Sequence, residues 1–227
     1  MAQVTRQGGR VARIKIPTAP KLLPSLRSAE TPRDDLEDDA IIKGVRYSGT
    51  VFAGVAAEAV EIEGCQFDGT RLTGIELRGS QISDSVFDTC DFAQASMHDV
   101  SLIRCKVNGS RITGSSWKSA MFRDVRFQAC PSGPAMYRDS KLYSVVFTDC
   151  KMHGADFQRA SMHNVRFENC DLTGAQFANA DMGVVRFDGC TLIDVGGAAS
   201  LRGATVQGPG SMELALSLAR EAGILFE

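Results

Sequence analysis

Cysteine is the residue type in this chain of 227 residues that could most readily hold a metal or act as a nucleophile. Five of the seven cysteines are separated by multiples of twenty residues: Cys90, Cys130, Cys150, Cys170 and Cys190. Metal ligation needs sulfurs that converge on one point, whereas side chains repeated at a fixed interval run parallel. The spacing therefore favours small, polarizable core residues. Cys65 and Cys105 share a second such column and are interpreted in the same way.

Histidine and carboxylate side chains do not combine into a catalytic set either. His98, His153 and His163 each follow a methionine at a position predicted to point inward, so each is expected to point outward, in different columns. No Ser-His-Asp or Cys-His set can be assembled, and the chain has neither a phosphate-binding loop nor a dinucleotide fingerprint. We therefore predict a protein that is not an enzyme and uses no catalytic residue, cofactor or metal.

Composition and charge limit the classes of protein to which the chain could belong. Hydrophobic residues make up 44% of the chain, enough to fill a continuous core, and the formal net charge is −2. Such a balance points neither to nucleic acid binding nor to an acidic mimic of nucleic acid. No stretch approaches the roughly 18 apolar residues of a membrane span, and no signal peptide is recognised. A soluble, cytoplasmic protein with reduced thiols and no membrane partner is expected.

The elements that carry these residues follow a period of five. From Ile42 to Leu192 a large apolar residue falls on almost every fifth position, as in Phe147, Met152 and Phe157. Neither a helix, with a period of 3.6, nor a strand, with a period of 2, explains this spacing. A small residue sits two places before each large one and glycine often two places after it, which predicts two inward residues and one corner per unit.

Sorting the positions by twenty separates the large residues into four columns. The first column contains Phe67, Phe87, Val107, Phe127, Phe147, Phe167 and Phe187. The second passes through Leu72 and Phe92, the third through Leu77 and Trp117, and the fourth through Ile62 and Ile82. Like residues recur within a column, so four five-residue units are expected to close one coil.

The tandem from Cys170 to Cys190, CDLTGAQFANADMGVVRFDGC, resembles the A-[DN]-L-x-x repeat of the pentapeptide-repeat family. This resemblance extends in phase over Ile42–Leu192. It implies an all-β fold, a right-handed quadrilateral β-helix. With strands stacked ~4.8 Å apart, nearly eight coils would make a rod of roughly 37 Å.

The repeat divides the chain into three parts. Residues 1–40 are expected to be a polar, mostly disordered extension, because residues 1–29 carry six basic and no acidic side chains whereas residues 30–39 carry six acidic ones. Residues 41–207 form the predicted β-helix. Residues 208–227 contain a predicted helix, SMELALSLAREA, which begins near Ser211 and ends before Gly223.

The C-terminal segment has two possible roles. Leu214, Leu218 and Phe226 could cap the open end of the rod within one chain. The segment also resembles the C-terminal stretch that joins two protomers in quinolone-resistance members of the family. That resemblance implies a homodimer with these three residues at its seam.

One row of outward residues stands out by its charge. Basic residues precede the large residue of the first column at Arg46, Lys106, Arg126, Arg166 and Arg186. Acidic residues follow it at Asp68, Asp88, Glu168 and Asp188, so the row could form surface ion pairs of little energetic value. The alternative is a surface for an anionic partner, and Lys106, Arg126, Arg166 and Arg186 are its candidate residues.

Two functions from different classes remain. The first is a non-catalytic module for protein–protein interaction or structural support, with a protein partner that the sequence does not name. The second, implied by the family resemblance, is a DNA-mimicking modulator of DNA gyrase or topoisomerase. The array from Ile41 to Asp194 holds 18 acidic and 16 basic residues, whereas duplex DNA carries about one negative charge per 1.7 Å. The charge therefore favours the first function.

Overall fold

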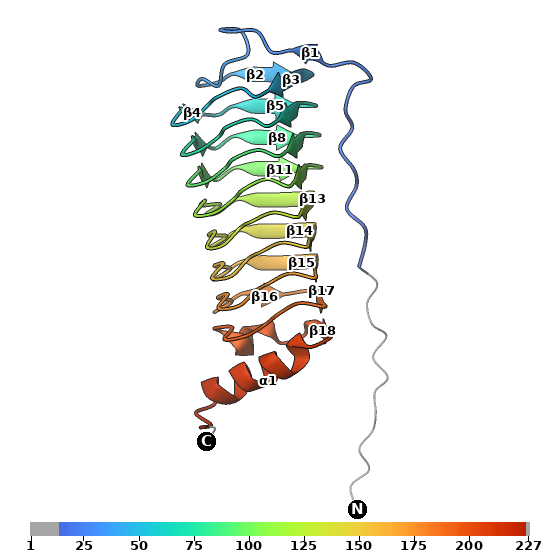
Figure 1. Ribbon diagram of the computed structural model, residues 1–227, viewed down its shortest axis with the longest axis vertical. Helices are drawn as coiled ribbons and strands as arrows, with labels where there is room; N and C mark the ends of the chain where they lie inside the picture. The colour runs from blue at the N-terminus through green and yellow to red at the C-terminus, as the bar shows by residue number, and fades with distance from the viewer. Residues whose placement is uncertain (1–13, 226–227) are drawn as a thin grey trace, which may run out of the picture.

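The computed structural model describes residues 14–225, in which strands pair in parallel with the strands twenty residues further on, except at the two ends of the rod, where Arg27 pairs with Val45 and Phe187 with Val206. Val107 pairs with Phe127, Phe127 with Phe147, and Phe147 with Phe167. Four five-residue units therefore complete one coil, as the sequence predicts. About nine coils stack into a β-solenoid with the N-terminal coil at one end and a helix at the other (Figure 1).

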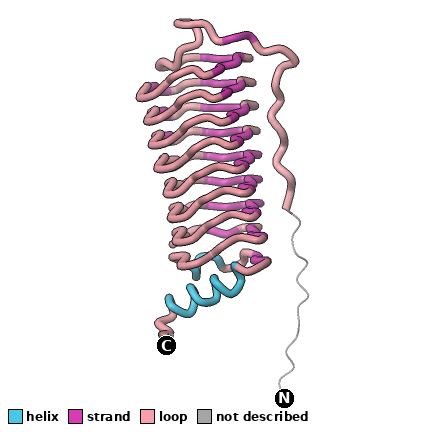
Figure 2. Tube along the Cα trace, viewed as in Figure 1, coloured by secondary structure: helices cyan, strands magenta, loops and turns pink. Residues whose placement is uncertain are grey.

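The strands form rows along the rod, and the loops between the rows form its corners (Figure 2). We number the faces after the columns of large residues. On the first face lie β3 (Val45–Ser48), β6 (Gln66–Asp68), β9 (Val86–Asp88), β12 (Lys106–Asn108), β17 (Val185–Asp188) and β18 (Thr205–Gln207). On the fourth face lie β2 (Ile41–Lys43), β5 (Glu61–Glu63), β8 (Gln81–Ser83), β11 (Ser101–Ile103) and β16 (Asp181–Met182).

Three longer strands run through the corner between the fourth and first faces: β13 (Met121–Gln128), β14 (Lys141–Thr148) and β15 (Ser161–Glu168). The third face has a short sheet of β4 (Ala56–Glu58), β7 (Glu76–Arg78) and β10 (Ser96–His98). The second face is joined by isolated parallel bridges, such as Lys151 to Asp171. Its coils are held by the same ladder, in which Leu72 N donates to Asp91 O at 2.7 Å.

The corners explain the regular glycines. The residue two places after most large residues has a left-handed backbone, as at Gly109 (φ 56°) and Gly174 (φ 69°). Glycine adopts this conformation without a steric penalty, and asparagine and aspartate tolerate it better than most other residues. Aspartate or asparagine accordingly occupies several other corners, including Asp124 (φ 57°) and Asn164 (φ 60°).

The core consists of columns of stacked side chains. In the first column the rings of Phe127, Phe147, Phe167 and Phe187 lie 4.8, 5.0 and 5.0 Å apart between successive centroids, with interplanar angles of 4–7°. All four rings are buried. The stack follows from the coil spacing, because identical side chains on successive coils are held at about the strand separation of ~4.8 Å.

The N-terminal end is closed by residues 27–40. The two-residue strand β1 (Arg27–Ser28) pairs with β3, which covers the first open edge of the first face. Leu36 is buried against the first coils, and Tyr47 donates its hydroxyl hydrogen to Asp34 O at 2.7 Å. Asp34 in turn forms an ion pair with Arg27. Residues 27–40 thus cover the open backbone edge of the first coil and the core side chains that it would otherwise expose.

The C-terminal end is closed by the 3-10 helix η1 (Ala198–Leu201) and by α1 (Gly210–Glu221). In the interior of the rod, Leu172 N donates to Thr191 O of the next coil. The equivalent N–H of Leu192 donates instead to Glu213 Oε2, at 2.5 Å. Glu221 accepts from the N–H groups of Ala198 and Ala199. Carboxylates of α1 thus replace the carbonyls of a coil that does not follow.

Of the N-terminal extension that was expected to be mostly disordered, residues 14–26 follow the outside of the rod in an extended conformation (Figure 1). We call this segment the strap. It runs from the C-terminal half of the rod back to β1, along the corner between the fourth and first faces. Its composition, which is basic and proline-containing, did not predict this docking.

The core stack yields a stability prediction. Replacing Phe147 by alanine should reduce the free energy of unfolding by ~3–5 kcal/mol, because the neighbouring coils cannot collapse into the cavity. Replacing the exposed Gln128 by alanine should change it by about 0.5 kcal/mol or less. Chemical denaturation of the two variants measures both values. Equal losses would contradict the inward and outward assignment.

Candidate interaction surface

The four basic residues selected from the sequence lie on one row of the first face. Strand pairing places Lys106 beside Arg126 on successive coils and Arg166 beside Arg186. Val146 separates the two pairs, because it occupies the same position on β14. The row is therefore not a continuous line of cations.

Neighbouring carboxylates neutralise the second pair. Arg166 Nε lies 2.8 Å from Glu168 Oε1 and 2.8 Å from Asp188 Oδ2. Arg186 Nη2 lies 2.9 Å from Asp188 Oδ1, and hydrogen bonding to this carboxylate raises the pKa of Arg186. The first face therefore presents paired charges of both signs, which suits mixed polar contacts better than the binding of a polyanion.

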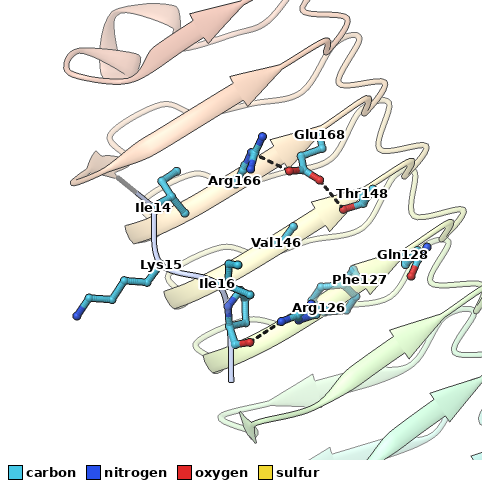
Figure 3. Close-up of a pocket in the computed structure, with 11 residues that line it drawn as sticks. Ile14, Lys15, Ile16, Arg126, Phe127, Gln128, Val146, Thr148, Arg166 and Glu168 are labelled. Atoms are coloured by element: carbon cyan, nitrogen blue, oxygen red, sulfur yellow. Dashed lines mark hydrogen bonds and ion pairs between the residues drawn. The ribbon is translucent and has the colours of Figure 1, made fainter. Parts of the chain in front are cut away.

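Arg126, of the first pair, contacts the strap. Its Nη2 donates to Pro17 O at 2.6 Å. The strap and the first face enclose a groove of about 300 Å³, in which Ile14–Pro17 form one wall and Val146 lies on the floor (Figure 3). Arg166 and Glu168 line the opposite side with Thr148. A polar pocket with an apolar floor thus lies beside two of the four residues chosen from the sequence.

Three residues at one corner hold the strap through its backbone. Lys15 N donates to Asn164 Oδ1 at 2.6 Å, Thr18 N to Asp124 Oδ1 at 3.0 Å, and Lys21 N to Asp84 Oδ1 at 3.0 Å. We call Asp84, Asp124 and Asn164 the acceptor track. They stand on alternate coils at the same corner position.

The intervening coils brace the acceptor track. Arg104 donates to both carboxylate oxygens of Asp84, from Nε at 2.7 Å and from Nη2 at 2.5 Å. Ser144 Oγ accepts from Asn164 Nδ2 at 2.8 Å. Two of the three side chains that meet the strap, Asp84 and Asn164, are thus held in position by a neighbouring coil, as a preorganised binding site requires.

Sequence reasoning missed the acceptor track. The only signal was a change of residue type at this corner, which is glycine at Gly44 and Gly64 and polar from Asp84 to Asn164. Such a change is also compatible with ordinary solvated corners. Nothing in the sequence links it to a segment about 60 to 150 residues away.

The cysteines are buried thiols, and all seven are free. Burial raises the pKa of Cys90 to about 11 and that of Cys105 to about 12, so both are neutral at physiological pH. Cys170 Sγ donates to Glu168 O and Phe147 O, at 3.3 and 3.4 Å. The thiols therefore fill the small core positions and donate to carbonyl groups of the neighbouring strands, as Cys170 does to Phe147 O and Glu168 O.

The remaining candidates for chemistry lie apart on the surface. His98 Nδ1 lies 2.8 Å from Asp99 Oδ2, and the exposed His153 and His163 stand on other faces. Among residues 14–225, no group of three or more histidine, cysteine, aspartate or glutamate side chains is arranged to hold a metal ion. No helix in this part of the chain is long and apolar enough to cross a membrane.

The proposed dimer seam is divided by the fold. Leu214 packs against the core of its own chain, Leu218 is 40% exposed, and Phe226 lies outside the described residues. The face of α1 that points away from the rod carries Met212 and Leu216, which are 69% and 38% exposed. Sequence reasoning chose Leu214 because it could not show which side of the helix meets the rod.

The fold of the described residues is a β-solenoid of repeated five-residue units. The family model of the pentapeptide repeat region matches residues 120–195. The same five-residue pattern and the same coil geometry continue on both sides of that range. Residues 120–195 thus form a pentapeptide repeat region, and pentapeptide repeat proteins generally serve as structural or interaction modules.

Solved structures of this family show similar but distant chains. HetL, a pentapeptide repeat protein involved in heterocyst differentiation regulation from the cyanobacterium Nostoc sp. strain PCC 7120, is 12% identical, with a TM-score of 0.42 over 74% of this chain and 89% of that chain. A trypsin-treated variant of QnrB1, a plasmid-mediated fluoroquinolone resistance protein, is 14% identical, with a TM-score of 0.39 over 88% and 96%. Comparison with the curated proteins found no match. No role for this chain follows from these similarities.

The link between Asp84 and Arg104 yields a pH prediction. Hydrogen bonding to Arg104 holds the pKa of the Asp84 carboxyl below its usual value. Its contribution to stability is present above the unfolded-state pKa of about 3.9 and is lost as the pH falls through the folded-state pKa. Wild type should therefore unfold at higher denaturant concentration than Asp84→Asn at pH 7, and the difference should vanish in acid.

Denaturant titrations of both chains at several pH values, with the exposed Asp181→Asn as control, measure this effect. A difference between wild type and Asp84→Asn that stays constant at every pH would contradict the assignment.

Proposed function

We propose that this protein is a non-catalytic interaction module that binds a protein partner through its first face and the adjoining strap. The observation that carries the proposal is the groove between Ile14–Pro17 and the row of Arg126, Val146 and Arg166. It combines a preorganised backbone with an apolar floor and charges of both signs. Protein interfaces of the non-obligate type have this mixed character.

The charge distribution also favours a protein partner over mimicry of DNA. Residues 30–100 hold 15 acidic and 5 basic side chains, whereas residues 101–227 hold 12 acidic and 14 basic ones. The acidic surplus is therefore confined to the N-terminal coils and their cap. A mimic of duplex DNA would need negative charge along the rod. Modulation of DNA gyrase remains the alternative, and a cytoplasmic location is part of the same proposal.

Site-specific photo-crosslinking in the native cell tests the proposal. A photoreactive residue in place of Gln128, beside the groove, should capture one dominant protein partner, because that side chain lines the interface. The same residue in place of Gln158, on the third face, is the matched control and should not capture it. Equal capture from both faces would refute a specific first-face interface, and recovery of gyrase subunits would support the alternative.

We further propose that the chain forms a homodimer through the outward face of α1. Met212 and Leu216 are large exposed apolar side chains one helical turn apart, and Leu218 of the predicted seam is 40% exposed. Contiguous apolar surface of this kind on a terminal helix marks an association site. A second copy supplies the same apolar face across a twofold axis, which is the commonest symmetry of soluble oligomers.

The dimer has a direct test in solution. Replacing both Met212 and Leu216 by glutamate should convert dimers into monomers in multi-angle light scattering, because four carboxylates would meet at the seam. Arg123→Glu, at an exposed site on the fourth face, should leave the dimer intact. A wild-type chain that is monomeric at high concentration would refute the proposal.

A further inference from the structure

The hydrogen-bond donors of the strap and the residues of the acceptor track are spaced at matching intervals along the rod. Successive donors on the strap, Lys15, Thr18 and Lys21, are three residues apart. The acceptors that they meet are forty residues apart, which is two coils of the solenoid. One strap triplet therefore spans two coils at each step.

This match has a geometric basis. Three residues of a polyproline II helix advance ~9.3 Å, and two coils of strands advance ~9.6 Å. The polyproline II helix also has three residues per turn, so every third N–H group points in the same direction. An extended chain in this conformation can therefore donate to one corner of the rod with a mismatch of only about 0.3 Å per step.

The burial of the strap side chains also follows a period of three residues. Pro17 is buried against the rod, and Ile14 and Pro20 are half-buried, so the residue before each donor faces the first face. Ile16, in contrast, is 80% exposed. Proline is compatible with the positions that do not donate, because it lacks an N–H group and favours the polyproline II conformation.

The pairing of strap donors with corner acceptors stops at Lys21 and Asp84, and the next position on each side explains why. The next donor position after Lys21 is Pro24, which has no N–H group, and the next alternate corner is Gly44, which has no side chain. Leu23 lies against Gly44, where a Cβ atom would stand 2.9 Å from its Cδ1. The strap then continues into β1 and becomes part of the cap.

The acceptor track binds the main chain of the strap and not its side chains. Each acceptor takes an N–H group, and opposite charges meet at one of the three contacts, where the strap residue is Lys21 and the acceptor is Asp84. Recognition through main-chain hydrogen bonds tolerates many sequences, as in strand addition to a sheet edge. The strap is therefore one example of a class of ligands.

We propose that the acceptor track is a binding site for an extended, basic, proline-containing peptide of a partner protein, and that the strap occupies this site in the isolated chain. The partner peptide carries an apolar residue or proline at every third position, each followed by a residue with a free N–H group. In the complex the partner peptide takes the place of the strap beside Arg126, Val146 and Arg166. The inference therefore rests on the proposed first-face interface and deepens it by naming the recognition element of the partner.

Substitution of the strap donors by proline tests the inference in the full-length chain. Lys15→Pro, Thr18→Pro and Lys21→Pro together remove the three donors, and proline is compatible with an extended chain. Ile16→Pro, Ala19→Pro and Leu22→Pro together form the matched control. They add the same number of prolines at positions between the donors.

The probe is a fluorescent peptide with the sequence of residues 14–25, and the readout is anisotropy. The chain without donors should bind it at least tenfold more tightly than wild type or the control, because a tethered strap competes at an effective concentration of about millimolar. Equal binding by the three chains, or none by any of them, would overturn the inference.

A second comparison places the peptide on the acceptor track. In the chain without donors, Asp124→Ala should weaken peptide binding at least fivefold. Asp149→Ala, at a left-handed corner of another column (φ 53°), should not weaken it. Equal losses would overturn the assignment of the site. Capture from position 128 in the crosslinking experiment is independent of these results, so failure of the peptide site leaves the first-face interface standing.

Discussion

The regular backbone ladder between coils twenty residues apart is the constraint on which the rest of the structure depends. Each inner coil donates and accepts hydrogen bonds on both sides, so its length cannot change without breaking the ladder above and below it. The same constraint places Phe127, Phe147 and Phe167 in one stack. It also places every outward residue in a row along the rod. Core and surface are therefore ordered by one interaction.

A rod built in this way has two ends that need separate solutions. At the N-terminal end a strand, β1, continues the ladder, whereas at the C-terminal end the carboxylates of Glu213 and Glu221 substitute for missing carbonyl groups. Both solutions satisfy backbone groups that a solenoid otherwise leaves open. The C-terminal solution also turns one face of α1 toward the rod and leaves Met212 and Leu216 on the other.

The same order gives the surface its capacity for recognition. A partner that repeats at a matching interval can contact several coils in an identical manner, and the strap does so with three N–H groups. Arg104 and Ser144 hold the acceptors from the coils between. The cations of the first face are used differently, since Arg166 and Arg186 pair with Asp188. The position of a residue along the rod, and not the net charge of the chain, therefore decides which part of the surface can bind a given ligand.

The sequence alone was sufficient to predict the coil of four five-residue units, because the period of five is local and each unit has the same order of inward and outward residues. It identified the inward cysteines, the stacked first column and the terminal helix from spacing alone. It could not reveal the acceptor track, because the match between the strap and Asp84, Asp124 and Asn164 depends on the pitches of two conformations that meet only in space. Nor could it orient Leu214, since which side of a helix is buried is decided by the surface that it packs against.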